Sequence, residues 1–146
     1  TGIQAMDLVG RKIAREGGAT AKARLAELKK LDARLAGQPE IPKALADGVK
    51  AVEECVDFIV GAKDPRVQFA GAVPFLKLMG IVAGGWQMAR AALVAEKGSD
   101  DFLAAKIKTA RFYAEHVMVQ APALRDTVVK GGAGVMALSD EQFLTA

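Results

Sequence analysis

Few side chains in this sequence are of the kinds that carry out covalent or acid–base chemistry. The only two serines, Ser99 and Ser139, stand where helices are expected to begin, and neither lies in a Gly-x-Ser-x-Gly motif. Serine at a helix start favours capping over nucleophilic catalysis. The single histidine, His116, follows Glu115, but adjacent helix residues point in different directions, so this carboxylate is not placed to orient the ring. The sequence predicts no catalytic residue.

Metal, disulfide and phosphate-binding motifs are also missing from the sequence. Cys55 is the only cysteine, which excludes an internal disulfide and a Cys-based zinc site, and one histidine cannot form a His-type site. Cys55 lies on the apolar side of a helical pattern, which predicts a buried thiol in a reducing, cytoplasmic compartment. The glycines of 84–85 and 131–134 follow no strand and carry no Walker lysine, so they favour helix packing and chain termination.

Positive charge is concentrated between Arg11 and Arg34. The chain has a net charge of +3, and this segment holds Arg11, Lys12, Arg15, Lys22, Arg24, Lys29, Lys30 and Arg34 against only Glu16, Glu27 and Asp32. Such a patch could meet nucleic acid, anionic lipid or an acidic protein. No aromatic residue is interleaved and no DNA-binding motif is present, so a solvated helix face is favoured, an acidic partner surface comes second, and no nucleic-acid partner is predicted.

The neighbouring carboxylates show no arrangement for acid–base catalysis. Glu53 and Glu54 are adjacent in sequence, which indicates a solvated face, and Asp100 and Asp101 suit the positive end of a helix dipole. Neither pair shows the burial that would raise a pKa for general acid catalysis.

The elements that carry these residues are predicted to be helical almost throughout. Apolar residues recur at spacings of three and four, and Gly17-Gly18, Gly37, Gly61 and Gly98 mark helix ends. Asp64-Pro65 and Ser99 or Asp100 mark helix starts. The predicted apolar faces are Ile3, Met6, Val9, Ile13; Ala21, Leu25, Leu28, Leu31, Leu35; Ile41, Leu45, Val49, Val52, Val56, Ile59; and Leu103, Ile107, Ala110, Ala114, Val117, Ala121.

These spacings predict an all-α fold, an antiparallel up-down-up-down four-helix bundle with an additional N-terminal helix. Residues 1–16 form the N-terminal helix, residues 17–132 the bundle, and residues 133–146 a tail with one short helix capped by Ser139. Pro122 is expected to bend or break the last long helix, and Gly131-Gly132 to end it.

The predicted helix from Pro65 to Lys97 is apolar nearly all round. Such a helix is expected to be buried on every side, by its own bundle or by a partner. Pro74 should kink it, while Gly80, Gly84 and Gly85 should let a neighbouring backbone approach closely. Its uncharged stretch, 78–89, is shorter than the ~20 residues that span a bilayer, so no membrane span is predicted.

Three stretches of the chain resemble the FAD-dependent acyl-CoA dehydrogenases. The opening, Thr1-Gly2-Ile3-Gln4 and the helix that follows it, is similar to the segment directly after that family's catalytic-base motif, Tyr-Glu-Gly-Thr. Residues 75–89 and, most specifically, Lys108 to His116 resemble the carboxy-terminal extension of a larger-bodied branch. The resemblance covers nearly the whole chain.

The resemblance implies α,β-dehydrogenation of an acyl-CoA thioester in fatty acid metabolism. In that family a glutamate takes the α-proton, FAD accepts the β-hydride, and electron-transfer flavoprotein reoxidises the flavin. The glutamate is not in this sequence, so the chain itself is expected to be inactive and to bind no cofactor. In the intact enzyme, Thr1, Gly2 and Gln4 would line the FAD site. The expected partners are the remainder of the dehydrogenase body and, in the parent, further copies and electron-transfer flavoprotein.

The expected role of the chain is then structural, with the helix over 65–97 packing against the dehydrogenase body or another subunit. The alternative is a free-standing helical protein-interaction (dimerisation) module, and a third hypothesis is an anion or nucleic-acid binder that works through the basic segment 11–34. The acyl chain length does not follow from the sequence.

Overall fold

The computed structural model describes residues 1–31, 35 and 37–144, and these ranges contain helices and no strand. The helices are α1 (Gly2–Asp7), α2 (Ala19–Lys29), α3 (Glu40–Gly61), α4 (Pro65–Ala70), α5 (Ala72–Ala95), α6 (Asp101–His116), α7 (Ala121–Val135) and α8 (Asp140–Leu144). The predicted all-α class is confirmed. A π-helical stretch, Leu8–Ile13, extends α1, and a 3₁₀ turn, Met118–Gln120, joins α6 to α7.

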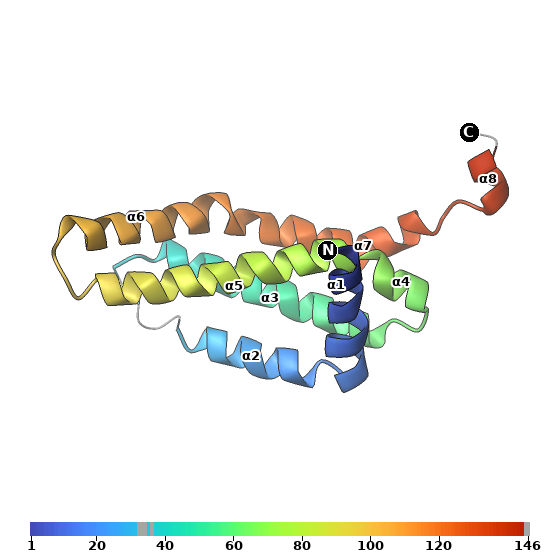
Figure 1. Cartoon of the computed structure of the whole chain (residues 1–146), viewed down its shortest axis with the longest axis horizontal. Helices are drawn as coiled ribbons and strands as arrows, with labels where there is room; N and C mark the ends of the chain where they lie inside the picture. Colours follow the sequence, from blue (N-terminus) through green and yellow to red (C-terminus); the bar gives the residue numbers. More distant parts are fainter. Residues whose placement is uncertain (32–34, 36, 145–146) are drawn as a thin grey trace.

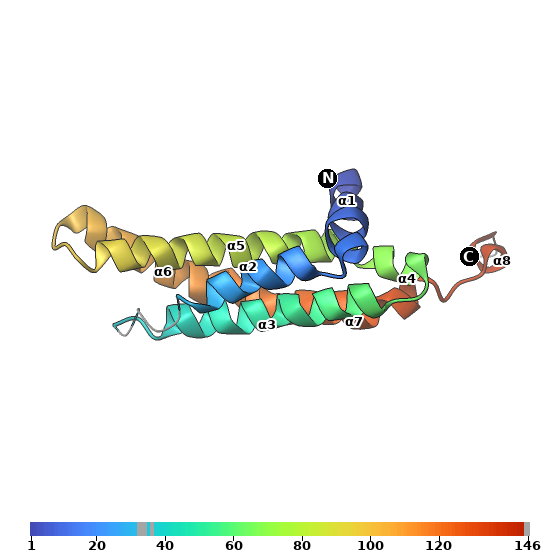
Figure 2. The ribbon, with the colours of Figure 1, turned by 90° about the horizontal axis from the view of Figure 1, so that it is seen from below.

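The helices form an elongated bundle (Figure 1). The long rods α3, α5 and α6 with α7 lie lengthwise against one another, and α2 packs on α3. The stretch from α1 crosses one end of the bundle and stands out from it, as the turned view shows (Figure 2). The tail that carries α8 leads away from the opposite side of that end.

The core is built from aliphatic side chains at the positions that the helical periodicity predicts. The whole predicted stripe of α3, Ile41, Leu45, Val49, Val52, Val56 and Ile59, is buried. Phe75, Leu78 and Val82 of α5 and Val128 of α7 complete the central contact. The predicted face of the first helix is only half right: Val9 and Ile13 are buried, whereas Ile3 and Met6 are exposed.

Several helix boundaries differ from the prediction. Pro74 does not kink a single long helix, because α4 and α5 separate earlier, at Gly71. A Cβ at Gly71 would lie 3.1 Å from the Val128 Cα, so a larger residue there would require α7 to move by a few tenths of an ångström. Pro74 is the third residue of α5, where its missing N–H costs no helical hydrogen bond.

The C-terminal half also departs from the prediction in detail. The predicted last long helix is divided before Pro122, because the 3₁₀ turn Met118–Gln120 separates α6 from α7. Helix α7 then continues through Gly131 and Gly132 to Val135. Gly98 does not adopt the left-handed conformation; among the described residues only Gly17 (φ 60°) and Gly18 (φ 76°) do. The second helix ends at Lys29, before Gly37. The prediction that Asp64 caps a helix is confirmed, since its Oδ1 accepts from the Arg66 N–H at 2.9 Å.

Helix α5 is packed against α3, α6 and α7 but is not covered all round. Val73, Lys77, Gly80, Ala83, Gln87, Arg90 and Val94 form one exposed stripe along it. The bundle by itself therefore does not bury α5 on every side, and cover of the exposed stripe by a partner stays a prediction. By length and composition alone α5 could also cross a membrane, a property that core helices share.

Candidate functional site

The residues that the resemblance associates with FAD lie at the exposed start of α1. Thr1, Gly2 and Gln4 are all exposed, and a Cβ built at Gly2 meets no atom within 4 Å. Only the backbone is engaged, where the Ala5 N–H donates to the Thr1 carbonyl at 2.9 Å. These residues are free to touch a flavin that another part of a protein holds, but they do not enclose one.

The side chains that could act as acids, bases or nucleophiles do not lie together. His116 stacks on Phe112 with ring centroids 4.2 Å apart, on the outer face of α6. Ser99 is exposed, and Asp100 is the residue that caps α6, accepting from the Leu103 N–H at 2.9 Å. Over residues 1–31, 35 and 37–144, no three His, Cys, Asp or Glu side chains gather as a metal site would require.

Cys55 is fully buried, as predicted. Burial raises the pKa of its thiol from 9.0 to about 12, because the apolar surroundings disfavour the thiolate more than the positive charge of Arg125 favours it. A thiol of this kind stays protonated at neutral pH and is unreactive.

The prediction that Glu53 and Glu54 form a solvated face holds only in part, since their side chains are 34% and 36% exposed. Both are half-buried and each joins α3 to a different helix. Lys29 of α2 donates to Glu53 at 2.6 Å, and Arg125 of α7 pairs with Glu54. The two carboxylates therefore act as separate tethers between helices, not as an acid–base pair.

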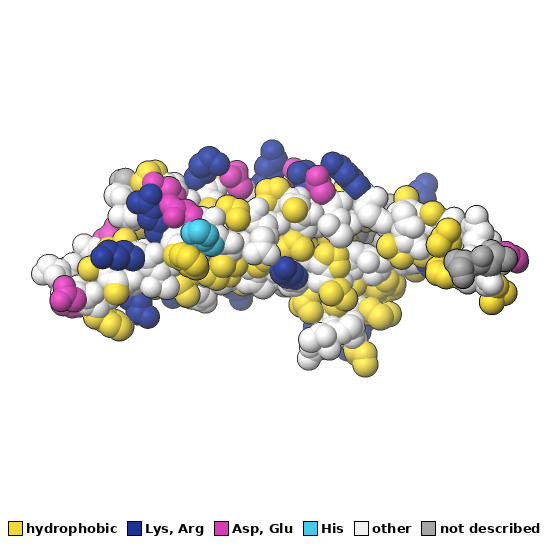
Figure 3. All heavy atoms as spheres, turned by 90° about the horizontal axis from the view of Figure 1, so that it is seen from above, with side chains coloured by type: hydrophobic (Ala, Val, Ile, Leu, Met, Phe, Trp, Pro, Cys, Tyr) yellow, Lys and Arg dark blue, Asp and Glu magenta, His cyan; other side chains and the backbone are white. Residues whose placement is uncertain are grey.

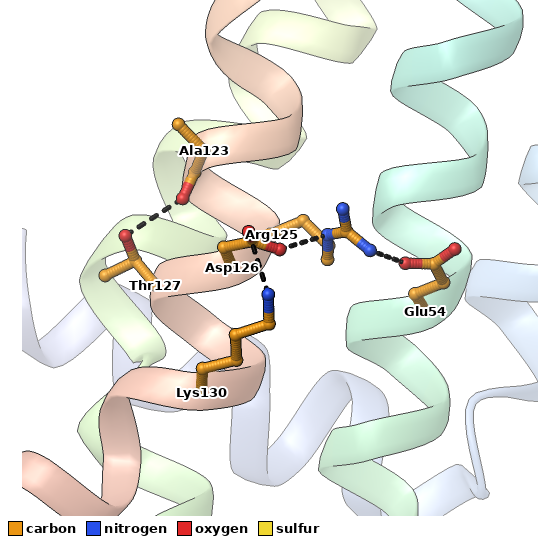
Figure 4. Close-up of polar contacts among 6 residues, drawn as sticks. All are labelled: Glu54, Ala123, Arg125, Asp126, Thr127 and Lys130. Atoms are coloured by element: carbon orange, nitrogen blue, oxygen red, sulfur yellow. Dashed lines mark hydrogen bonds and ion pairs between the residues drawn. The ribbon is translucent and has the colours of Figure 1, made fainter.

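A charged cluster lies at the seam between α3 and α7 (Figure 4). Arg125 lies between Glu54 and Asp126, with its Nε 2.8 Å from Asp126 Oδ1, and Lys130 reaches Asp126 Oδ2 at 3.1 Å. A cavity of about 310 Å³ opens beside it, lined by Asp47, Lys50, Ala51, Glu54, Pro122 and Arg125. Positive and negative groups offset each other there, so the cluster clamps two helices and does not select a charged ligand. Nothing in the sequence links Glu54 to Arg125, which lie 71 positions apart.

Several basic side chains of the segment 11–34 pair with nearby acids. Lys22 pairs with Asp57 at 2.7 Å, Lys29 with Glu53, and Arg24 with Glu27 at 2.6 Å. Arg34 and Asp32 lie outside the described residues. The solvated-face interpretation accounts for these pairs better than a dedicated anion site does.

An apolar hollow separates α2 from α5. It encloses about 210 Å³ and is lined by Ala21, Arg24, Leu25, Leu28, Met79, Val82, Ala83 and Trp86. Arg90 lies over the Trp86 ring, 4.9 Å from its centroid. Residues of both helices line this hollow, and we call it the α2–α5 trough.

Comparison with known proteins identifies the family of this chain. Residues 14–139 match the family model described as "Acetyl-CoA dehydrogenase C-terminal like". The chain is 38% identical, over 151 aligned positions and 95% of its own length, to 3-methylmercaptopropionyl-CoA dehydrogenase of Ruegeria pomeroyi (strain ATCC 700808 / DSM 15171 / DSS-3). It spans only 26% of that relative's length. No solved structure shows a significant match. A family model that matches most of this helical chain shows that it belongs to the acetyl-CoA dehydrogenase C-terminal like family.

Proposed function

We propose that this chain is the C-terminal helical domain of an FAD-dependent acyl-CoA dehydrogenase and that it supports the reaction without carrying it out. The observation that carries the proposal is the family match over residues 14–139 together with a relative, named as a dehydrogenase, that is almost four times as long. The body of such an enzyme would supply the flavin site and the base.

Within that enzyme, α1 is the element closest to the chemistry. FAD would supply the hydride acceptor, and Thr1, Gly2 and Gln4 would line its site from the exposed start of α1. This role is supported by the accessibility of all three residues and by the open space at Gly2. A larger residue at position 2 would fill that space.

The remainder of the bundle would serve as an interface in the same enzyme. Exposed apolar residues on α5, such as Val73 and Val94, are suited to burial against the dehydrogenase body or another subunit. Homo-oligomerisation, reoxidation by electron-transfer flavoprotein and a cytoplasmic location belong to this proposal. The acyl-CoA substrate is not specified by it.

The test compares this chain with the complete polypeptide encoded by its gene. The complete polypeptide is expected to purify with bound flavin and to oxidise an acyl-CoA thioester in the presence of an electron acceptor. The chain alone is expected to show neither flavin absorbance nor turnover. Flavin-dependent oxidation by the chain alone, or a complete polypeptide without flavin, would refute the proposal.

The alternative function is a free-standing protein-interaction module. It is favoured by the exposed apolar side chains Phe102, Phe112 and Val119 on the outer face of α6 and the turn after it. A reading frame with no dehydrogenase body upstream of Thr1 would favour this alternative.

A further inference from the structure

The C-terminal arm, which we define as residues 137–144, exposes apolar side chains away from the bundle. Leu138, Phe143 and Leu144 are 54%, 66% and 87% exposed, although large apolar residues normally avoid water. The arm leads away from the end of α7, past the end of the bundle (Figures 1 and 2). Asp140 and Glu141 make the start of α8 acidic.

The α2–α5 trough has the complementary character. Its wall is aliphatic apart from Trp86 and Arg24, so it offers water almost no hydrogen-bonding partner. The small side chains of Ala21 and Ala83 leave the hollow between the helices. Arg24 at its rim pairs with Glu27, whereas Arg90, which lies over Trp86, bonds only the neutral amide of Gln87 among the described residues and adds positive charge beside the hollow.

We propose that the C-terminal arm of one copy docks into the α2–α5 trough of a second copy. Phe143 and its apolar neighbours would fill the hollow, and Asp140 would lie near Arg90, where opposite charges fix the orientation. Exchange of arms in both directions makes each contact twice, as in a closed twofold dimer.

The arm's own trough is a less favourable target. Only four residues separate the end of α7 at Val135 from the start of α8 at Asp140, and the arm already points past the end of the bundle. The docking of a second copy needs no rearrangement of α7. The proposal is independent of the flavin chemistry, because neither surface includes the start of α1.

The first test measures mass by light scattering across a range of concentrations. The full chain is expected to form a dimer, whereas a chain that ends at Met136 stays a monomer. Ala83→Glu, at an exposed residue of the trough, should weaken the dimer by about tenfold or more. Ala23→Glu, at an exposed residue of α2 outside the trough lining, is the matched control and should leave the mass unchanged.

The second test is a charge exchange between arm and trough. Asp140→Lys and Arg90→Glu are each expected to weaken the dimer, and the double variant should recover most of the loss, because the two groups again have opposite charges. Both residues are exposed, so circular dichroism should report unchanged helicity.

The third test uses Trp86, the only tryptophan, as a reporter in the trough wall. A peptide of residues 137–144 is expected to shift its fluorescence when added to the chain that ends at Met136. Three results would overturn the proposal: a monomeric full chain, a dimer that survives removal of the arm, or a fluorescence change in the full chain that does not depend on concentration.

Discussion

At the scale of single residues, the glycines of α5 receive side chains and not a neighbouring backbone. Tyr113 of α6 lies over Gly84 and donates its hydroxyl to the Ile81 carbonyl at 3.1 Å. The Met118 side chain lies between Gly85 and Gly48, which face each other from α5 and α3. By contrast, Gly80 has open space around it.

This difference predicts opposite effects for two identical substitutions on one helix. Gly84→Ala should lower the free energy of unfolding by about 1–3 kcal/mol, because the new Cβ would overlap the Tyr113 hydroxyl. Gly80→Ala should raise it by up to ~1 kcal/mol through helix propensity alone. Urea unfolding of both variants checks the prediction, and equal effects would contradict it.

The buried thiol of Cys55 predicts a loss of stability at high pH. The folded pKa of about 12 lies above the ordinary value of 9.0, so folding favours the protonated thiol. The contribution is complete below pH 9 and is lost as the pH rises towards 12, at roughly 1 kcal/mol per pH unit. Urea unfolding at several alkaline pH values should show a shallower decline for Cys55→Ala, and parallel curves would argue against this cause.

At the scale of elements, helix ends are set by particular side chains. The sequence allows either Ser99 or Asp100 to cap α6, and the structure selects Asp100, whose carboxylate accepts from the Leu103 N–H.

Substitution at the two positions should therefore differ. Asp100→Ala is expected to lower the free energy of unfolding by about 1 kcal/mol, because an N-terminal amide of α6 loses its acceptor. Ser99→Ala, the adjacent control, should change it by less than ~0.5 kcal/mol. Thermal unfolding of the two variants measures this difference in stability. A larger loss for Ser99→Ala than for Asp100→Ala would show that Asp100 is not the cap.

At the scale of the whole molecule, exposed apolar side chains lie on α1, on the outer face of α6 and on the C-terminal arm. Hydrophobic side chains gather where α1 stands out from the bundle (Figure 3), and Ile3 there is 85% exposed. A residue so exposed contributes little to the folding of this chain, and we expect it to contact the dehydrogenase body.

Ile3→Asp separates these two roles. In the isolated chain it should change the free energy of unfolding by less than ~0.5 kcal/mol, as at other surface sites. In the complete polypeptide it should lower thermal stability and flavin content, because a charge would be buried at the contact. Lys63→Asp, at an exposed residue between α3 and α4, is the control for added charge. An unchanged complete polypeptide would contradict this assignment of α1.

The sequence by itself determined the helical class, the buried face of α3 and the family. Periodicity reports which side chains share a helix face, and the stripe from Ile41 to Ile59 is buried at every predicted position. The resemblance over Lys108 to His116 and the opening segment pointed to the family that the comparison then showed.

Only the tertiary structure decided where helices break and which charges pair. Val128 of α7 lies against Gly71, where α4 and α5 separate, and the Glu54–Arg125 contact joins residues 71 positions apart. The exposure of Ile3 and Met6 likewise depends on where α1 crosses the bundle. Local spacing specifies a face within one helix, whereas these features depend on which other helix meets that face.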